Sequence, residues 1–112
     1  MDDFYINGIR WKIKFVDIDN PILTRSDGSK TVGMTDWNSC TVYLESKLHG
    51  RFLERVLCHE LCHCICFSYG IIMDIEQEEI LADWISLHGR EVIDLLDHLL
   101  TKMAEKLPKT CP

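Results

Sequence analysis

The sequence predicts a single α+β domain, with a small twisted sheet of three to four strands in its N-terminal part packed on a helix, and one or two further helices behind it. Three observations favour this class. Apolar and polar residues alternate with a period of two near the start of the chain, whereas a helical period begins near residue 48. The 112 residues suit one domain, 1–112, and contain no repeat or linker that would mark a second.

An Asn-Gly pair predicts the hairpin that opens the sheet. Asn7-Gly8 separates the short segment 4–6 from the longer segment 9–16, and this dipeptide is the strongest two-residue turn signal. Within 9–16, basic residues alternate with four apolar ones, which predicts one buried and one exposed face. The apolar positions are Ile9, Trp11, Ile13 and Phe15.

Two further short strands are expected after a loop. Residues 17–30 are rich in Asp, Asn, Ser, Gly and Pro, which is typical of irregular structure. Strands are then predicted at 31–35 and 40–44, with a turn between them.

The first long helix is expected to begin at 48–51 and to end at Tyr69, with Gly70 as the left-handed residue after it. Five residues recur at helical spacing and are expected to face the sheet. They are Leu53, Val56, Leu57, Leu61 and Cys64.

A second helix is expected from Ile75 to His88, with Asp74 as its N-cap, and helical periodicity continues from 90 to 107. Gly89 marks either a break or a weak point, and Pro108 is expected to end the order. The apolar face of the last segment is more often core than a surface for pairing with a second copy, so the oligomeric state stays open. This face contains Val92, Ile93, Leu95, Leu96, Leu99, Leu100 and Met103.

The segment His59-Glu60-Leu61-Cys62-His63 has the pattern HExxH. On a helix, residues four apart lie on one face, so both imidazoles can bind one zinc ion. Glu60 projects beside the metal, where a general base for a zinc-bound water is needed.

A tetrahedral zinc site with two histidines needs a third protein ligand and an open position. Glu79 is the predicted third ligand, because the residues between His63 and the second helix allow a chain reversal. Asp83 shares a face with Glu79 and is expected to accept the far ring N–H of a ligating histidine. Glu78 is expected to be solvated.

The six cysteines predict free thiols in a reducing compartment. Four of them crowd the motif helix, and no CxxC pair is present. Recruitment of Cys62 or Cys66 as a metal ligand is the alternative, and Cys62 lies on a different face from His63.

Charge and hydropathy limit the partners. A net charge of −6 argues against binding to nucleic acid or to an anionic membrane. The acidic N-terminus differs from a signal peptide, and no apolar run has the length of a membrane span. A cytoplasmic protein is expected.

The HELCH motif followed by EEILADWIS resembles the gluzincins, in which HExxH lies on one helix and a glutamate ligand on the next. The spacing of Glu79 and Asp83 is similar to the thermolysin-type second motif. With the segment GMTDWNSCTVYLES, the chain resembles ImmA/IrrE-type metallopeptidases and small phage-borne zincins over residues 33–88.

The resemblance implies a minimal zincin-like domain that hydrolyses a peptide bond in a protein or peptide substrate, with one Zn²⁺ per chain. Glu60 would take the proton of the water and pass it to the leaving amine. Candidates for a second oxyanion donor are Tyr69, His88 and Tyr43. A strand near 40–44 would form the edge of the cleft, and a phage or mobile-element origin is implied.

Two alternatives remain at this point. In one, zinc only stabilises a protein-binding module by joining two helices. In the other, the histidines are satisfied within a helical domain that binds no metal.

Overall fold

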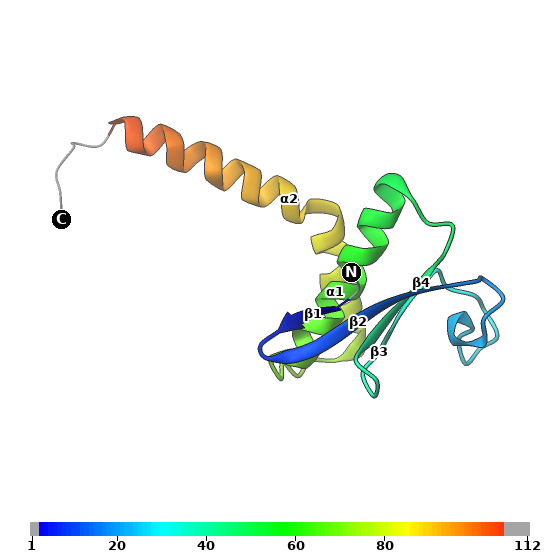
Figure 1. Ribbon diagram of the computed structural model, residues 1–112. Helices are drawn as coiled ribbons and strands as arrows, with labels where there is room; N and C mark the ends of the chain where they lie inside the picture. The colour runs from blue at the N-terminus through cyan, green and yellow to red at the C-terminus, as the bar shows by residue number, and fades with distance from the viewer. Residues whose placement is uncertain (1–2, 107–112) are drawn as a thin grey trace.

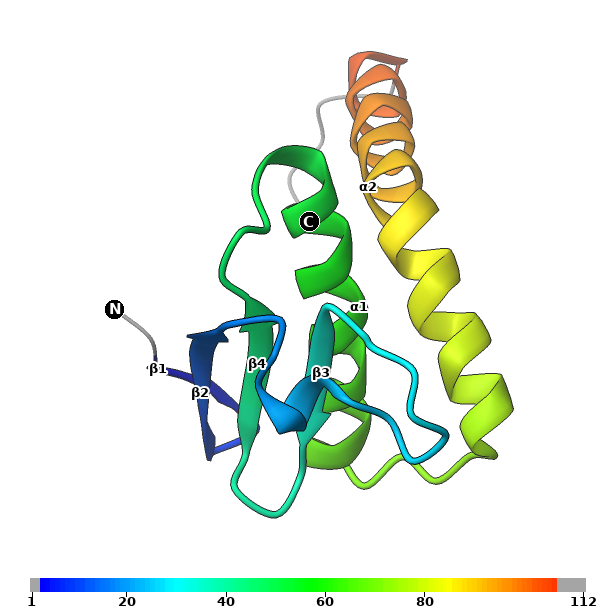
Figure 2. The same ribbon diagram turned by 90° about the vertical axis from the view of Figure 1, so that its right-hand side faces the viewer.

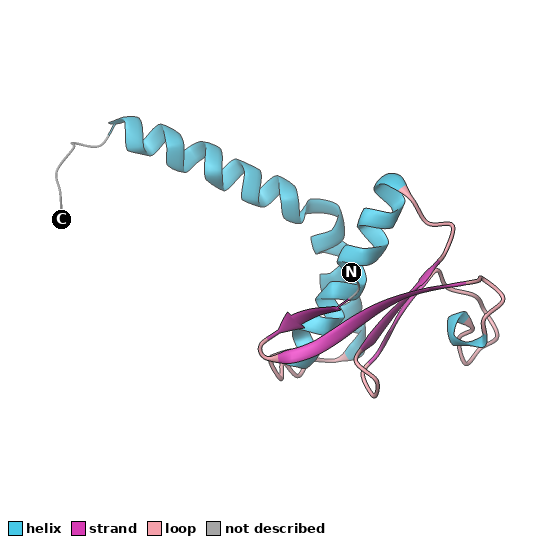
Figure 3. Cartoon of the chain, in the orientation of Figure 1, coloured by secondary structure: helices cyan, strands magenta, loops and turns pink. Residues whose placement is uncertain are grey.

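The predicted α+β class is confirmed by a computed structural model, which describes residues 3–106. A mixed four-stranded sheet forms one layer, helix α1 (Gly50–Ser68) packs on it, and helix α2 (Ile75–Lys106) packs along α1 (Figures 1 and 2). All strands precede residue 46, and both long helices follow it (Figure 3). No helix among residues 3–106 combines the length and the apolar character needed to cross a membrane.

The sheet contains β1 (Asp3–Ile6), β2 (Ile9–Val16), β3 (Gly33–Asp36) and β4 (Thr41–Glu45), in the order β1-β2-β4-β3. β1 and β3 pair with their neighbours in antiparallel fashion, whereas β2 and β4 are parallel. The connection between β2 and β3 includes the short 3-10 helix η1 (Pro21–Leu23).

The strand expected to form the cleft edge is interior, so that expectation was wrong. β4 is inserted between β2 and β3, which leaves β3 at the edge of the sheet. Both apolar residues Val42 and Leu44 of β4 are fully buried, as is usual for an internal strand. The order of strands in a sheet depends on long-range pairing, which hydrophobic periodicity does not encode.

The Asn-Gly turn forms as predicted and also holds the end of α1. Asn7 and Gly8 have φ angles of 49° and 79°, the left-handed values that a tight hairpin turn needs. The Asn7 side-chain amide donates to the carbonyl of Ser68 at 3.0 Å. In addition, the buried Trp11 indole N–H donates to the Ser68 hydroxyl at 2.8 Å. The hairpin thereby fixes the last turn of α1 on the sheet.

The core lies between the sheet and α1, and its fully buried members are Trp11, Val42, Leu44 and Cys64. Leu53, Val56 and Leu57 of α1 pack against this cluster, as expected. Two expectations fail. Phe15 is 53% exposed, although it lies beside the fully buried Leu44 in the sheet. Leu61 is half-buried outside this cluster.

Helix α1 ends in the predicted left-handed glycine. Gly70 has a φ of 64°, its amide donates to the carbonyl of Phe67, and the amide of Ile71 donates to that of Cys66. This pair of bonds is a Schellman motif, which satisfies carbonyls that the helix leaves free. The chain then reverses into α2 within six residues.

Helix α2 is one continuous helix of 32 residues, so Gly89 is not a break. Its first part packs along α1, and the rest projects away from the domain (Figure 1). The apolar face of the last segment, expected as core, is exposed from Val92 to Met103. The expectation was wrong because α1 is too short to cover it. Pro108 lies outside the described residues.

Replacement of Ser68 by Ala is expected to lower the free energy of unfolding by about 1–3 kcal/mol, because the Trp11 indole N–H would stay buried without a partner. Urea denaturation followed by tryptophan fluorescence measures the change. Ser86→Ala is the matched control, since that half-buried helical hydroxyl donates only to a nearby carbonyl of its own helix. Equal losses in the two variants would contradict the role of the Ser68 hydroxyl.

Candidate metal centre

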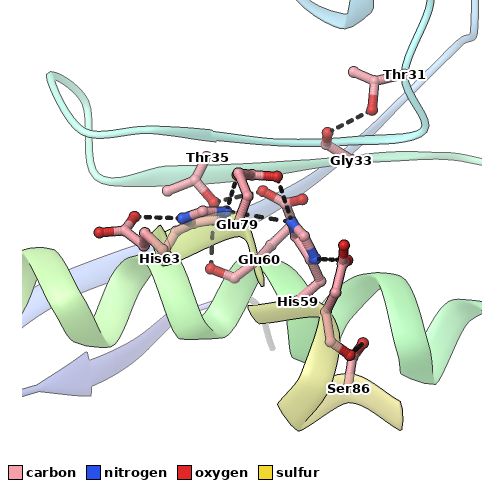
Figure 4. Close-up of polar contacts among 10 residues, drawn as sticks. Thr31, Gly33, Thr35, His59, Glu60, His63, Glu79 and Ser86 are labelled. Carbon is pink, nitrogen blue, oxygen red and sulfur yellow. Dashed lines mark hydrogen bonds and ion pairs between the residues drawn. The ribbon is translucent and has the colours of Figure 1, made fainter. Parts of the chain in front are cut away.

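The two histidines of the HExxH motif converge with Glu79 between α1 and α2 (Figure 4). The Nε2 atoms of His59 and His63 lie 3.3 Å apart. One Glu79 carboxylate oxygen lies 2.6 Å from Nε2 of His63, and the other lies 3.3 Å from Nε2 of His59. The structure thus brings together the three residues that the sequence proposes as metal ligands.

Each imidazole also contacts a carboxylate through its other nitrogen. Asp83 lies 2.8 Å from Nδ1 of His59, and Glu78 lies 2.5 Å from Nδ1 of His63. A carboxylate at Nδ1 holds the proton on that nitrogen, so the lone pair of Nε2 points toward the other histidine and Glu79. This tautomer is the one that a metal ligand requires.

Asp83 therefore lies where it was expected, whereas the expectation for Glu78 was wrong. Glu78 is buried, with 6% of its surface exposed, beside the equally buried His63. The cause is the rotation of α2: Glu78 lies one turn before Ala82, which is fully buried against α1. The four-residue spacing of Glu78 and Ala82 was a signal for this in the sequence, but the same spacing of Glu79 and Asp83 drew attention away from it.

The Glu60 carboxyl is held beside the cluster by the edge strand of the sheet. The Thr35 hydroxyl of β3 donates to one Glu60 oxygen at 2.8 Å (Figure 4). Burial raises the pKa of Glu60, while the bond from Thr35 and the nearby imidazoles partly offset that rise. A carboxylate with a raised pKa is a better proton acceptor than an exposed one.

Gly33 allows β3 to lie this close to α1. A Cβ atom at this position would lie 2.7 Å from the Val56 side chain and 3.3 Å from Glu60. A side chain at this position would therefore force the Val56 side chain to shift. The absence of a side chain at Gly33 thus lets β3 approach α1 closely, which brings Thr35 to Glu60.

The residues present fit a zinc ion. Two imidazole nitrogens and one carboxylate are a common ligand set for zinc sites that keep an open position. Ligand atoms about 2.0–2.1 Å from zinc lie about 3.3 Å apart in a tetrahedron. Two of the three ligand separations, from His59 to His63 and to Glu79, have this value.

The cysteines do not join this cluster. The five cysteines in the described range are free, and Cys111 lies outside that range. Burial raises the pKa of Cys62 to about 11 and that of Cys64 to about 12, and it also raises that of Cys66. Among the described residues, the possible ligand atoms that lie within 4.8 Å of one another belong to His59, His63 and Glu79, and no cysteine is among them.

The cluster opens into a cavity of about 650 Å³. The edge strand β3 forms one wall, and residues of α1 and α2 form the others. The Glu79 side chain is 49% exposed, so the ligand cluster is accessible from the cavity. Arg25 and Arg55 also line the cavity and were missed by the sequence reasoning. Arg55 lies one turn before His59, which was a usable signal.

None of the three candidates for a second oxyanion donor lines this cavity. Tyr69 is 58% exposed at the end of α1, and Tyr43 lies on the interior strand β4. The His88 ring is tilted by 50° against that of Trp84 and contacts Glu91 along α2, outside the cavity. For His88 the spacing was a usable signal, because a residue nine positions after Glu79 lies on the opposite face of the same helix. For Tyr43, which lies on another element, helical spacing gives no distance to the site.

Comparison of the chain with protein-family models, with curated proteins and with solved structures found no match.

Replacement of Glu79 by Ala is expected to weaken zinc binding by at least about 100-fold, because it removes a direct ligand. Glu78→Gln is expected to weaken it by about 10- to 100-fold, because it alters the partner of His63. Competition with a fluorescent chelator measures both affinities. Glu76→Ala is the control, since that exposed residue lies on the same helix. Equal zinc affinities in all variants would show that the ligands lie elsewhere.

Proposed function

We propose that this protein is a zinc-dependent endopeptidase, which hydrolyses a peptide bond in protein or peptide substrates. The observation that carries the proposal is the position of Glu60. Its buried carboxyl is held by Thr35 next to two histidines and a glutamate that can bind one metal ion, at the wall of an open cavity. A purely structural metal site needs no such carboxylate beside its ligands.

The chemistry follows from the residues of the chain. Zn²⁺ held by His59, His63 and Glu79 would activate water and polarise the scissile carbonyl. Glu60 would accept a proton from the attacking water and deliver it to the leaving amine. Thr35 keeps the Glu60 carboxyl oriented, and the carboxylates at Nδ1 keep both imidazoles in the ligating tautomer.

The edge strand offers a way to bind an extended substrate. β3 pairs only with β4 among the described strands, so its other edge faces the cavity. An extended peptide could add to that edge by main-chain hydrogen bonds, which would place a peptide bond beside Glu60. Arg55 is our candidate for stabilising negative charge that develops on the substrate, because it lines the same cavity one turn from His59.

We also propose, from the resemblance of its motif, that the protein is a small gluzincin-type peptidase of phage or mobile-element origin. The five free cysteines among residues 3–106 are consistent with a reducing compartment such as the cytoplasm.

Glu60→Gln is expected to keep zinc affinity and fold but to lower peptide cleavage by at least about 1000-fold, because the amide cannot accept the proton. Cleavage of a proteome-derived peptide library, read by mass spectrometry with zinc present, measures it. Glu54→Gln, on the exposed face of the same helix, is the matched control.

Full cleavage by the Glu60→Gln variant would contradict the proposed mechanism. A wild-type protein that binds zinc, loses thermal stability on chelation and cleaves nothing would favour the zinc-stabilised binding module instead.

Arg55→Ala is expected to lower kcat/KM by about 100-fold, chiefly through kcat, while zinc affinity stays unchanged. Steady-state kinetics on a peptide identified from the library measure it, and Arg51→Ala provides the control, since Arg51 does not line the cavity. A rise in KM alone would assign Arg55 to substrate binding rather than to charge stabilisation.

A further inference from the structure

A seam of mostly apolar residues runs along α2 from Glu78 to Met103. Its members are spaced alternately four and three residues apart, which is the heptad pattern of helices that pack side by side. The eight positions are Glu78, Ala82, Ile85, Gly89, Val92, Leu96, Leu99 and Met103.

The two halves of this seam have different surroundings. Glu78 and Ala82 are buried against α1, and Ile85 and Gly89 are half-buried. Beyond Arg90, which reaches Glu54 of α1 at 3.7 Å, every described residue of the helix is exposed. We call residues 91–106 the overhang. It is about 24 Å long at 1.5 Å per residue, and Figure 1 shows it projecting from the domain.

The overhang exposes a broad stripe of large apolar side chains. Each of them is between 43% and 56% exposed. They are Val92, Ile93, Leu95, Leu96, Leu99, Leu100 and Met103. Contiguous apolar surface of this kind marks an interaction site.

We propose that the overhang pairs with the overhang of a second copy of this chain, in antiparallel orientation. The seam is self-complementary in that orientation, because Leu96 then faces Leu99 of the second copy while Val92 faces Met103. The centre of this register falls within about one residue of the centre of the overhang, so the pairing covers nearly the whole stripe on both copies.

Charge also favours this orientation. The acidic residues Glu91, Asp94 and Asp97 lie on the polar face, away from the seam. The seam position that follows Met103 is Lys106. Parallel pairing would place Lys106 beside the Lys106 of the other copy, whereas antiparallel pairing separates the two lysines to opposite ends of the pair.

A second copy also fits better than a lipid surface. Amphipathic helices that lie on membranes are rich in Lys and Arg on their polar face. The polar face here carries Glu91, Asp94, Asp97 and Glu105 in a chain of net charge −6. The pairing lies along the helix beyond the metal centre, so it stands independently of the proposed function.

The experiment is light scattering with size exclusion of the full chain, with zinc present, at concentrations up to about 100 µM. The wild type is expected to give twice the mass of one chain. Leu96→Glu combined with Leu99→Glu is expected to give a monomer with unchanged melting of the domain. His98→Glu combined with Thr101→Glu, on the opposite face, is the control and should remain a dimer.

Cross-linking of an equal mixture of ¹⁴N- and ¹⁵N-labelled chains with a carbodiimide tests the orientation without any substitution. Links between copies are expected from Glu91 to Lys102, which are too far apart to be linked within one helix. A wild type that is monomeric at every concentration would overturn the proposal, whether or not it binds lipid vesicles. So would a dimer that survives Leu96→Glu with Leu99→Glu, or links between Glu105 and Lys106 of the two copies alone.

Discussion

The structure depends on helix α1 being held on two sides at once. The sheet fixes one side through the Trp11 core and the contacts of the hairpin with Ser68. The seam of α2 fixes the other, and it turns Glu78 and Glu79 toward the histidines. Neither partner alone would assemble the cluster, because Glu60 is oriented from the sheet and Glu79 comes from α2. The candidate metal centre therefore forms only where the sheet, α1 and α2 pack together.

Hydrogen bonding explains why these polar residues are tolerated in the interior. Buried polar groups must be hydrogen-bonded, and the contacts of Asp83 and Glu78 with the Nδ1 atoms meet this need for His59 and His63. Among the described residues, no buried side-chain nitrogen or oxygen lacks a hydrogen-bond partner. A metal ion would add charge compensation for Glu79, and the same contacts that satisfy the core would then orient the ligands. Stability and site geometry therefore rest on the same residues.

Local patterns predicted the local structure well. The Asn-Gly turn, the bounds of α1 to within a few residues, the left-handed Gly70 and the positions of His59, His63, Glu79 and Asp83 follow from spacing and turn chemistry. The failures all concern relations between elements. β4 became interior through long-range pairing, Glu78 became buried through the rotation of α2, and the last apolar face stayed exposed because α1 ends too soon. Tyr43 lies outside the cavity for the same reason, since spacing gives no distance between separate elements.

The central claim is that two imidazoles and one carboxylate form a single metal site. X-ray absorption at the zinc edge of the zinc-loaded protein tests it most directly. The account predicts nitrogen and oxygen scatterers only, at about 2.0–2.1 Å, with the outer-shell signature of two imidazoles. A sulfur shell at about 2.3 Å, or zinc that fails to bind at all, would contradict it.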